Sequence, residues 1–188
     1  MTEQKVNLPN GVTLERAKIK DVSKIVDLLA TVQIDTYANV TPDLTEEVVR
    51  KHAESKKFQR KIRRRNILRI IHPRRALWIA KSGEEIVGFA SAEIRKGKHW
   101  NSGLYVAISQ QGEGIGTAFM EERKRWHGPV DIYLNVVPKT PAVNFHKSFG
   151  FKPTGIEPAS IYENGQTLPL IEMRLAAQDQ HRALRRHK

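Results

Sequence analysis

Hydrophobic and polar positions alternate along some parts of this chain and recur at helical spacing along others. Alternation indicates a half-buried strand, and apolar residues at every third or fourth position indicate an amphipathic helix. The segments that predict strands are 12–17, 76–80, 85–94, 98–108, 131–137 and the arms 159–163 and 166–175 of a hairpin turning at Asn164-Gly165. The segments that predict helices are 22–32 behind Asp21, a second helix after Thr45, 114–126 and 141–149. Residues 1–11 are polar, and we expect them to fray.

This order of elements, β-α-α-β-β-β-α-β-α-β-β, alternates helices with strands and contains no internal repeat. It predicts an α/β fold whose mixed central sheet, of about six to seven strands, is flanked by helices. We expect a single domain over residues 1–175, followed by a basic tail over residues 176–188.

The segment 104–120 joins a strand-like run, a glycine-rich turn and an amphipathic helix. Gln111, Gly114 and Gly116 spell Gln-x-x-Gly-x-Gly, with a further glycine at position 112. The unpaired N–H groups at the start of a helix, together with the helix dipole, favour a phosphate group there. The spacing fits neither a P-loop nor a dinucleotide-binding Gly-x-Gly-x-x-Gly. A strand-to-helix turn that only needs glycines is the structural alternative.

Leu104-Tyr105-Val106 followed by this turn resembles motif A of the GNAT acetyltransferase superfamily. A second block, residues 141–151, resembles motif B of that superfamily, a short helix that ends in Gly-Phe. The resemblance extends over residues 77–175. It implies two splayed parallel strands, 104–108 and 131–137, that hold the pantetheine arm of acetyl-CoA between them. The implied activity is acetyl transfer from acetyl-CoA to the primary amine of a small molecule or peptide.

The resemblance also implies roles for individual residues. Backbone groups around Val106 and Ile108 would pair with the pantetheine arm, and Asn135 would reach its amides unless it is only a turn residue at a strand end. The predicted cofactor-binding residues are Val106, Ile108, Gln111, Gly112, Glu113, Gly114, Ile115, Gly116, Thr117 and Asn135. The predicted substrate-binding residues are Tyr37 and Tyr162, with Asp35 and Glu163 as further acceptor-side candidates.

Three positions depart from the usual pattern of the superfamily. Lys139 stands where motif B usually has asparagine, and the segment 99–103 lacks the glutamate that often serves as base. His146 replaces a tyrosine that usually protonates the departing thiolate. We predict His146 as the catalytic acid, because an imidazole with a pKa of about 6.5 exchanges protons near neutrality; a helix-surface histidine without a role is the alternative. His99 and Glu93 are weaker candidates for the base.

Composition excludes several other chemistries. The 188 residues include no cysteine, which excludes disulfides, thiolate metal sites and an acyl-cysteine intermediate, so acetyl transfer would be direct. No histidine spacing indicates a metal. No apolar run is long enough to span a bilayer and no leader is recognisable, so we expect a cytoplasmic protein without membrane contact. A homodimer is left open.

The net charge of +12 is concentrated in residues 51–75, which contain eleven Lys and Arg and one acid, Glu54. A sparse apolar stripe of Phe58, Ile62, Leu68 and Ile71 predicts a helix with a solvated basic face, exposed on most sides or mobile. Such a face would bind polyanions weakly and without sequence selectivity. A nucleic-acid-binding or catalytically weak CoA-binding module on the same fold therefore remains the alternative to an acetyltransferase.

Overall fold

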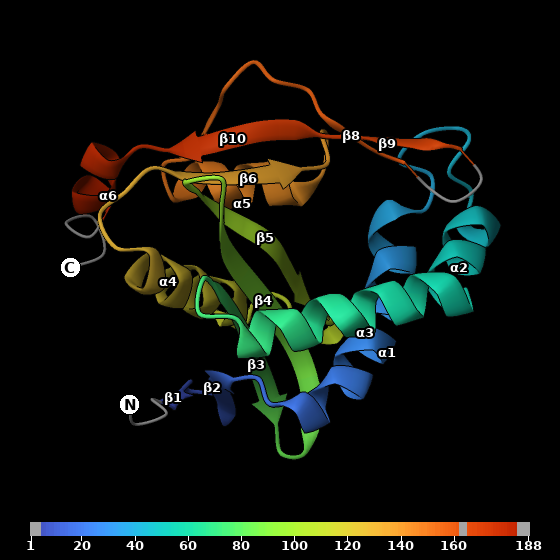
Figure 1. Cartoon of the computed structure of the whole chain (residues 1–188), viewed down its shortest axis with the longest axis horizontal. Helices are drawn as coiled ribbons and strands as arrows, with labels where there is room; N and C mark the ends of the chain where they lie inside the picture. The colour runs from blue at the N-terminus through green and yellow to red at the C-terminus, as the bar shows by residue number, and fades with distance from the viewer. Residues whose placement is uncertain (1–4, 162–164, 184–188) are drawn as a thin grey trace.

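The computed structural model describes residues 5–161 and 165–183, and it contains a central sheet between helices (Figure 1). In this part of the chain the main sheet has eight strands in the order β1-β2-β3-β4-β5-β6-β10-β7, and only β5 and β6 run parallel. The strands are β1 (Val6–Asn7), β2 (Val12–Arg16), β3 (Arg75–Ser82), β4 (Glu85–Arg95), β5 (Lys98–Val106), β6 (Ile132–Val136), β7 (Lys152–Pro153) and β10 (Ile171–Leu175). The mixed α/β sheet predicted from the sequence is confirmed.

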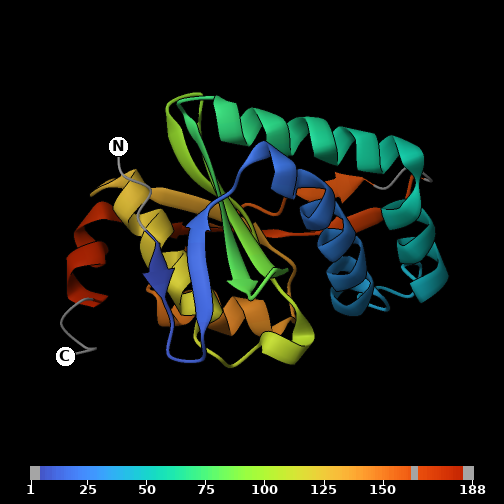
Figure 2. The same cartoon turned by 90° about the horizontal axis from the view of Figure 1, so that it is seen from below.

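The helices cover both faces of this sheet. They are α1 (Val22–Tyr37), α2 (Glu46–Glu54), α3 (Lys56–Ile71), α4 (Ile115–His127), α5 (Pro141–Ser148) and α6 (Ala177–Ala183), with short 3-10 turns η1 (Ile19–Asp21) and η2 (Ile108–Gln110). Seen from below, α1 and α3 lie on one side of the central strands and α4 on the other (Figure 2). Along β3, Leu77 and Ile79 pack toward α1 and α3, whereas Ala76, Trp78 and Ala80 pack toward α4. The strand is a continuous apolar run because both of its faces are covered.

The parallel pair β5–β6 separates toward the C-terminal ends of its strands. Pairing runs from His99 opposite Ile132 to Asn101 opposite Leu134 and stops there, although both strands continue. At the same point the pairing of β5 with β4 shifts register, so that Ser102 is an extra residue. A bulge bends the strand that carries it. Here the bulge accompanies the divergence of β5 from β6 and produces the predicted splay.

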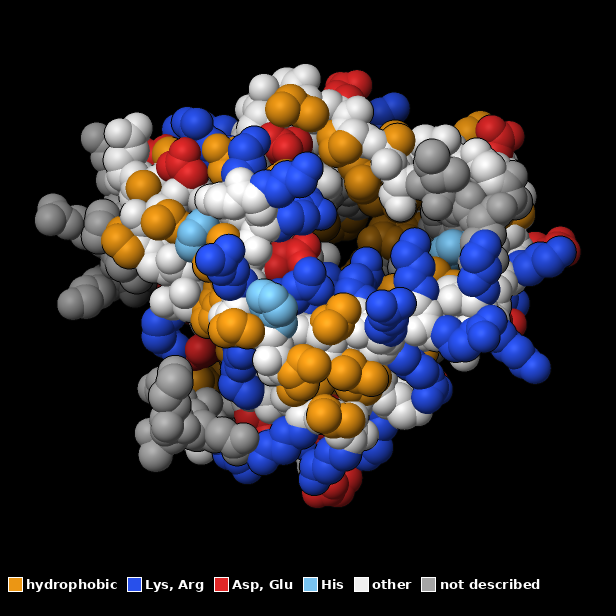
Figure 3. Space-filling model, viewed as in Figure 1, with side chains coloured by type: hydrophobic (Ala, Val, Ile, Leu, Met, Phe, Trp, Pro, Cys, Tyr) orange, Lys and Arg blue, Asp and Glu red, His pale blue; other side chains and the backbone are white. Residues whose placement is uncertain are grey.

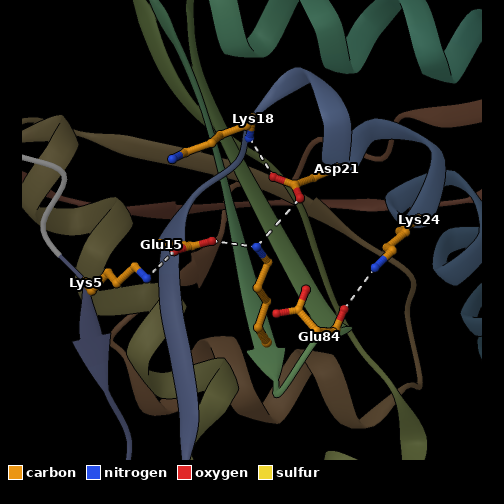
Figure 4. Close-up of polar contacts among 7 residues, drawn as sticks. Lys5, Glu15, Lys18, Asp21, Lys24 and Glu84 are labelled. Carbon is orange, nitrogen blue, oxygen red and sulfur yellow. Dashed lines mark hydrogen bonds and ion pairs between the residues drawn. The ribbon is translucent and has the colours of Figure 1, made fainter.

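A polar network holds the N-terminal strands against the start of α1 (Figure 4). The Nζ atom of Lys81, on β3, lies 2.7 Å from Glu15 Oε1 on β2 and 3.7 Å from Asp21 Oδ1. The hydrogen bond between Lys81 and Glu15 lowers the pKa of Glu15 and raises the pKa of Lys81. Asp21 directly precedes α1 as predicted, but its carboxylate accepts the backbone N–H of Lys18 (2.8 Å) instead of capping the helix.

The basic segment forms a regular helix, α3, which begins after Ser55. As predicted, it is exposed on most sides, and Arg60, Lys61, Arg63, Arg64 and Arg65 are all exposed. The predicted apolar stripe is wrong at two positions, because Leu68 is 37% exposed and Ile71 61% exposed. Ile62 is buried as predicted, but the other two buried positions of the helix are Asn66 and Arg69. The i, i+4, i+7 spacing of these three residues defines one narrow face of the helix.

Three other local predictions are wrong. Residues 6–7 do not fray, because they pair with β2. The predicted strand 98–108 ends at Val106, and Ile108 belongs to η2. The predicted strand 166–175 is broken: β9 (Thr167–Pro169) pairs with β8 (Ala159–Ile161) in a separate two-stranded sheet, and β10 joins the main sheet. The break follows Pro169, which has no backbone N–H to continue a ladder. Tyr162, Glu163 and Asn164 lie outside the described residues.

Candidate functional site

A cleft of about 650 Å³ opens where β5 and β6 separate. Its walls come from both strands, from the turn before α4, from the start of α5 and from the end of α1. Figure 3 shows a hollow in the molecular surface, with Lys and Arg side chains gathered over α3 below it. The predicted site residues that line the cleft are Tyr37, Val106, Ile108, Gln111, Gly112, Gly114, Ile115, Gly116, Thr117, Asn135 and His146. Glu113 does not line it, and its carboxylate accepts a hydrogen bond from Asn10 Nδ2 (3.2 Å).

The turn requires glycine at its three glycine positions for two different structural reasons. Gly112 and Gly114 have φ angles of +85° and +78°, which side chains other than glycine rarely adopt. Gly114 is the N-cap of α4 and provides no side-chain cap, so the first N–H groups of the helix have no partner inside it. At Gly116 an added Cβ would lie 3.3 Å from the ring of Phe145. The third glycine therefore lets α4 and α5 pack closely.

Gln111 shapes this turn from within. Its Nε2 donates to the carbonyl oxygen of Val106 (3.1 Å), and its backbone N–H donates to the carbonyl of Ile108 (3.1 Å). The first bond ties the turn to the end of β5, and the second ties it to η2. The side chain of Gln111 therefore holds the conformation in which the N–H groups of the turn face the cleft, and it occupies one acceptor position of the Val106 carbonyl.

His146 lies on α5 and is 8% exposed. Burial, and secondarily the positive charge of Arg123, lower its pKa from 6.5 to about 3. The imidazole is therefore neutral near pH 7, and its Nδ1 has no hydrogen-bond partner among the described residues. A neutral imidazole is a much weaker acid than an imidazolium, so the surroundings of His146 count against the predicted donation of a proton to the thiolate.

Arg123 lines the same cleft and was not predicted as a site residue. It lies on α4 and is only 1% exposed. Its Nη1 donates to the carbonyl oxygen of Gly103 (3.2 Å), and its Nη2 lies 3.7 Å from Met120 Sδ. Its Nε has no hydrogen-bond partner within the part of the chain that the structure describes. Burial lowers its pKa from 12.5 to about 9, so the guanidinium is still charged at neutral pH. The sequence does contain a signal for this residue: Arg123 is a charged residue one turn after Phe119, on the apolar face of the predicted helix.

His99, a candidate base, is not among the residues that line the cleft. Its Nδ1 lies 3.0 Å from Nδ1 of His127, whose Nε2 lies 3.1 Å from Asn101 Oδ1. Because an amide oxygen only accepts, Nε2 of His127 carries a proton, and Nδ1 of the neutral ring accepts from His99. Burial lowers the pKa of His99 and, more strongly, that of His127, to about 3. These two hydrogen bonds, from His99 to His127 and from His127 to Asn101, hold the side chain of Asn101, which lines the cleft.

Glu93, the other candidate base, is one hydrogen bond away from the cleft. Ser102, the bulged residue of β5, lines the cleft and donates its hydroxyl to Glu93 Oε1 (3.0 Å). Arg75 lies 3.8 Å from the other carboxylate oxygen and holds the group in place. Ser102 and Glu93 therefore form a path by which a proton could leave the cleft.

The side of the cleft that was predicted to bind the acceptor is lined by residues of α1 and β5. The hydroxyl groups of Tyr37 and Tyr105 lie 3.1 Å apart, and Tyr105 stacks on Phe89 with ring centroids 5.1 Å apart. Asp35 also lines this side of the cleft. The contact between Tyr37 and Tyr105 links the end of α1 to the strand that carries the bulge.

Comparison with solved structures identifies the fold. PaiA N-acetyltransferase from Thermoplasma acidophilum, solved with coenzyme A, has a TM-score of 0.62 at 16% identity, covering 87% of this chain and 99% of that one. Phosphinothricin acetyltransferase from Sinorhizobium meliloti, solved with acetyl-CoA, has a TM-score of 0.63 at 16% identity, covering 87% of each chain. YncA from Salmonella typhimurium, a putative acetyltransferase solved with acetyl-CoA, has a TM-score of 0.59 at 17% identity, covering 88% and 94%. The protein thus has the GNAT fold.

The sequence itself supports the same conclusion. Residues 73–153 match the family model described as acetyltransferase (GNAT) domain, a segment that contains the splayed strands, the glycine turn and α5. These residues are therefore similar in sequence to a GNAT domain, in agreement with the two motifs. No curated protein matches the chain in sequence. Within the described residues, no helix is long and apolar enough to cross a membrane, and no group of three potential metal ligands is found.

Proposed function

We propose that this protein is an N-acetyltransferase that moves the acetyl group of acetyl-CoA directly to the primary amine of a small molecule or peptide. The observation that carries the proposal is the single cleft that combines the splayed end of β5–β6 with the glycine turn and the unpaired start of α4. Coenzyme A and acetyl-CoA in the solved structures of similar fold support the same cofactor.

The residues of the turn fit a pyrophosphate group. An added Cβ at Gly112 or Gly114 would meet no atom within 4 Å, so the backbone faces open space there. N–H groups from residues 112–117 would bind the phosphates, and the pantetheine arm would follow the exposed edge of β5 past Asn135. Acetyl-CoA supplies the reactive thioester, and the protein supplies its orientation and the surrounding charges.

On the acceptor side, the amine would enter between Tyr37 and Ser102. An amine must be neutral to attack a carbonyl carbon, and its nitrogen must then lose a further proton as the amide forms, so a base is needed in the cleft for this second proton. Glu93 is the base that the geometry favours, because Ser102 can accept a proton from the amine while its own hydroxyl proton passes to the carboxylate. His99 is less suitable, because His127 separates it from the cleft-lining Asn101.

The exposed cations of α3 support the nucleic-acid alternative only in a limited form. Arg60, Lys61, Arg64 and Arg65 border a shallow groove on the outer side of this helix, together with Lys57 and Leu68. This groove is separate from the cleft and offers no aromatic side chain for stacking on a base. We therefore propose weak, non-specific polyanion binding as a property of this surface and not as the principal activity.

A panel assay tests the proposed activity. Thiol release from acetyl-CoA would be followed with small amines, amino acids, aminoglycosides and peptides as acceptors. The proposal predicts release that depends on at least one acceptor amine, with a matching acetylated product identified by mass spectrometry. Release that no acceptor accelerates above the rate of hydrolysis, in protein that binds acetyl-CoA, would instead support the catalytically weak CoA-binding module.

A further inference from the structure

The cleft contains a buried positive charge with no counter-ion. Arg123 is 1% exposed, and no carboxylate of the described residues forms an ion pair with it. Burying an unpaired ion is costly, and buried charges are normally paired or neutralised. By contrast, Arg125, two residues further along α4, is exposed and pairs with Glu122 on the same helix. The position of Arg123 therefore calls for an explanation beyond the packing of α4.

One hydrogen bond explains only part of this position. Gly103 lies beyond the last β5–β6 pair, and its carbonyl accepts from Arg123 Nη1, so the side chain provides a donor where the neighbouring strand has turned away. A neutral donor would satisfy this carbonyl equally well. The charge itself has no partner, and the nearby His146 is neutral because of its burial and because of Arg123. The guanidinium at the floor of the cleft is thus positively charged, and no carboxylate of the described residues is paired with it.

The reaction supplies an anion. If the protein is the acetyltransferase proposed above, the nitrogen of the amine attacks the thioester carbonyl carbon and forms a C–N bond, leaving an oxyanion. Collapse of this intermediate breaks the C–S bond, and sulfur takes the bonding electron pair as a thiolate. The amine enters as the neutral base, having lost its first proton to solvent, and its nitrogen becomes positively charged on attack. The nitrogen then gives up this second proton through Ser102 to Glu93. The one new negative charge that the reaction leaves in the cleft is therefore on the sulfur atom of CoA.

The two ends of the cleft place this sulfur near Gly103. Cofactor groups bound at the glycine turn and an amine bound beside Tyr37 and Ser102 can meet only along the open edge of β5 between them. Gly103 lies within that edge, and Arg123 is hydrogen bonded to its carbonyl. We propose that Arg123 stabilises the departing thiolate of CoA electrostatically, so that CoA leaves as an anion that has not been protonated in the cleft. This inference rests on the proposed function.

Titration of the CoA thiol in the binary complex tests the inference without relying on turnover. The ultraviolet absorbance of the thiolate would be followed against pH for free CoA and for CoA bound to wild-type protein, Arg123→Gln, Arg123→Lys and Arg125→Gln. Gln can still donate to the Gly103 carbonyl but has no charge. Arg125→Gln removes an exposed charge from the same helix and serves as the matched control.

In wild-type protein and Arg125→Gln, the bound thiol should titrate about one to three pH units below its value in Arg123→Gln, the range produced by an opposite charge within a few ångströms. Arg123→Lys should retain most of the shift. Equal titration of bound CoA in wild type and Arg123→Gln would overturn the inference, and so would a wild-type thiol pKa at or above that of free CoA, even if Arg123→Gln does not fold. Failure of wild-type protein to bind CoA, measured first by calorimetry, would instead remove the proposed function.

Discussion

Two positively charged regions of this protein differ sharply in their surroundings. The outer side of α3 carries many Lys and Arg side chains in contact with solvent, whereas Arg123 is one guanidinium enclosed by the cleft. Two charges 4 Å apart interact by about 1 kcal/mol in water and by about 4 kcal/mol at the effective dielectric near a protein surface. A single buried charge can therefore act on a reaction more strongly than a run of exposed ones. The segment that carries most of the net charge is therefore not the one whose charge is best placed to act on a reaction.

Removal of the buried charge should have the largest effect. Arg123→Gln should lower kcat by about 10²–10³-fold, the usual cost of losing one preorganised electrostatic contact to a developing charge. The KM for acetyl-CoA should change little, because the contact forms only as the C–S bond breaks. Steady-state kinetics with the best acceptor of the panel measure both constants. Arg125→Gln should keep the wild-type values, and an equal loss of kcat in that variant would remove the contrast between the two arginines.

Removal of the exposed charges should change a different property. Replacing Arg60, Lys61, Arg63, Arg64 and Arg65 by Gln should abolish binding to duplex DNA or heparin, while wild-type binding should fall steeply with salt. Helix α3 should persist, since Gln is a good helix former. Fluorescence anisotropy at several salt concentrations measures the binding. Acetyl-CoA affinity should not change. Sequence-selective binding that persists at high salt would reverse the ranking and favour the nucleic-acid alternative.

His146 provides a sharper comparison within the cleft. A positioned acid contributes about 10²–10⁴-fold, but a neutral imidazole cannot supply most of this, so His146→Ala should lower kcat by less than about tenfold. The pH profile of kcat should show no loss of activity near pH 6.5 from this residue, because its pKa is about 3. A loss in His146→Ala as large as that in Arg123→Gln, partly restored by His146→Tyr, would return the role of acid to position 146.

The smallest expected effect concerns a charged network that serves stability. Lys81→Met removes the partner of Glu15 and should lower the free energy of unfolding by about 1–2 kcal/mol at neutral pH. The pKa of Glu15 is lowered on folding. Its contribution to stability is therefore present above about pH 4.5 and is lost as the pH falls through the pKa of the folded protein. The pKa of Lys81 is raised on folding. Its contribution to stability is therefore present below about pH 10.5 and is lost as the pH rises through the pKa of the folded protein.

Denaturant titration of both proteins should therefore show the largest difference between pH 4.5 and pH 10.5 and a smaller one outside these limits. A difference that does not depend on pH would assign the effect of Lys81→Met to packing. Catalysis should be unaffected in either case, since Lys81 lies on β3 and does not line the cleft.

Local patterns in the sequence predicted much of the fold and one end of the site. The strand alternation, the N-cap at Thr45 and the glycine turn are encoded within a few neighbouring residues, and the structure contains each of them. Other features depend on contacts between distant segments. Gly116 faces Phe145 of another helix, Ser102 meets Glu93 across the β4–β5 bulge, and the burial of Arg123 follows from the divergence of β5 and β6. Periodicity alone does not reveal these contacts.

The exposed apolar positions of α3 illustrate the same limit. Leu68 and Ile71 were expected to face the core because they are apolar, yet Asn66 and Arg69 occupy the buried face. Arg69 Nη1 donates to Asn66 Oδ1 (3.1 Å), so the two polar residues partly satisfy each other. Burial lowers the pKa of Arg69 to about 9. Which side of a mostly polar helix is buried was decided by its position on the sheet and not by its own hydrophobicity.

Binding of acetyl-CoA in the cleft through the turn before α4 can be tested by one calorimetric comparison. Acetyl-CoA would be titrated into wild-type protein, Gly114→Glu and Gly128→Glu. Gly114 and Gly128 flank the two ends of α4, both have positive φ, and neither has an atom within 4 Å of an added Cβ. Gly128, with ψ at −169°, lies in a region that only glycine adopts readily, whereas Gly114, with ψ at −3°, is left-handed. Strain alone should therefore harm Gly128→Glu at least as much as Gly114→Glu. Wild type and Gly128→Glu should bind acetyl-CoA, whereas Gly114→Glu should lose binding, because its carboxylate would meet the phosphates. Equal binding by all three proteins would contradict binding through this turn.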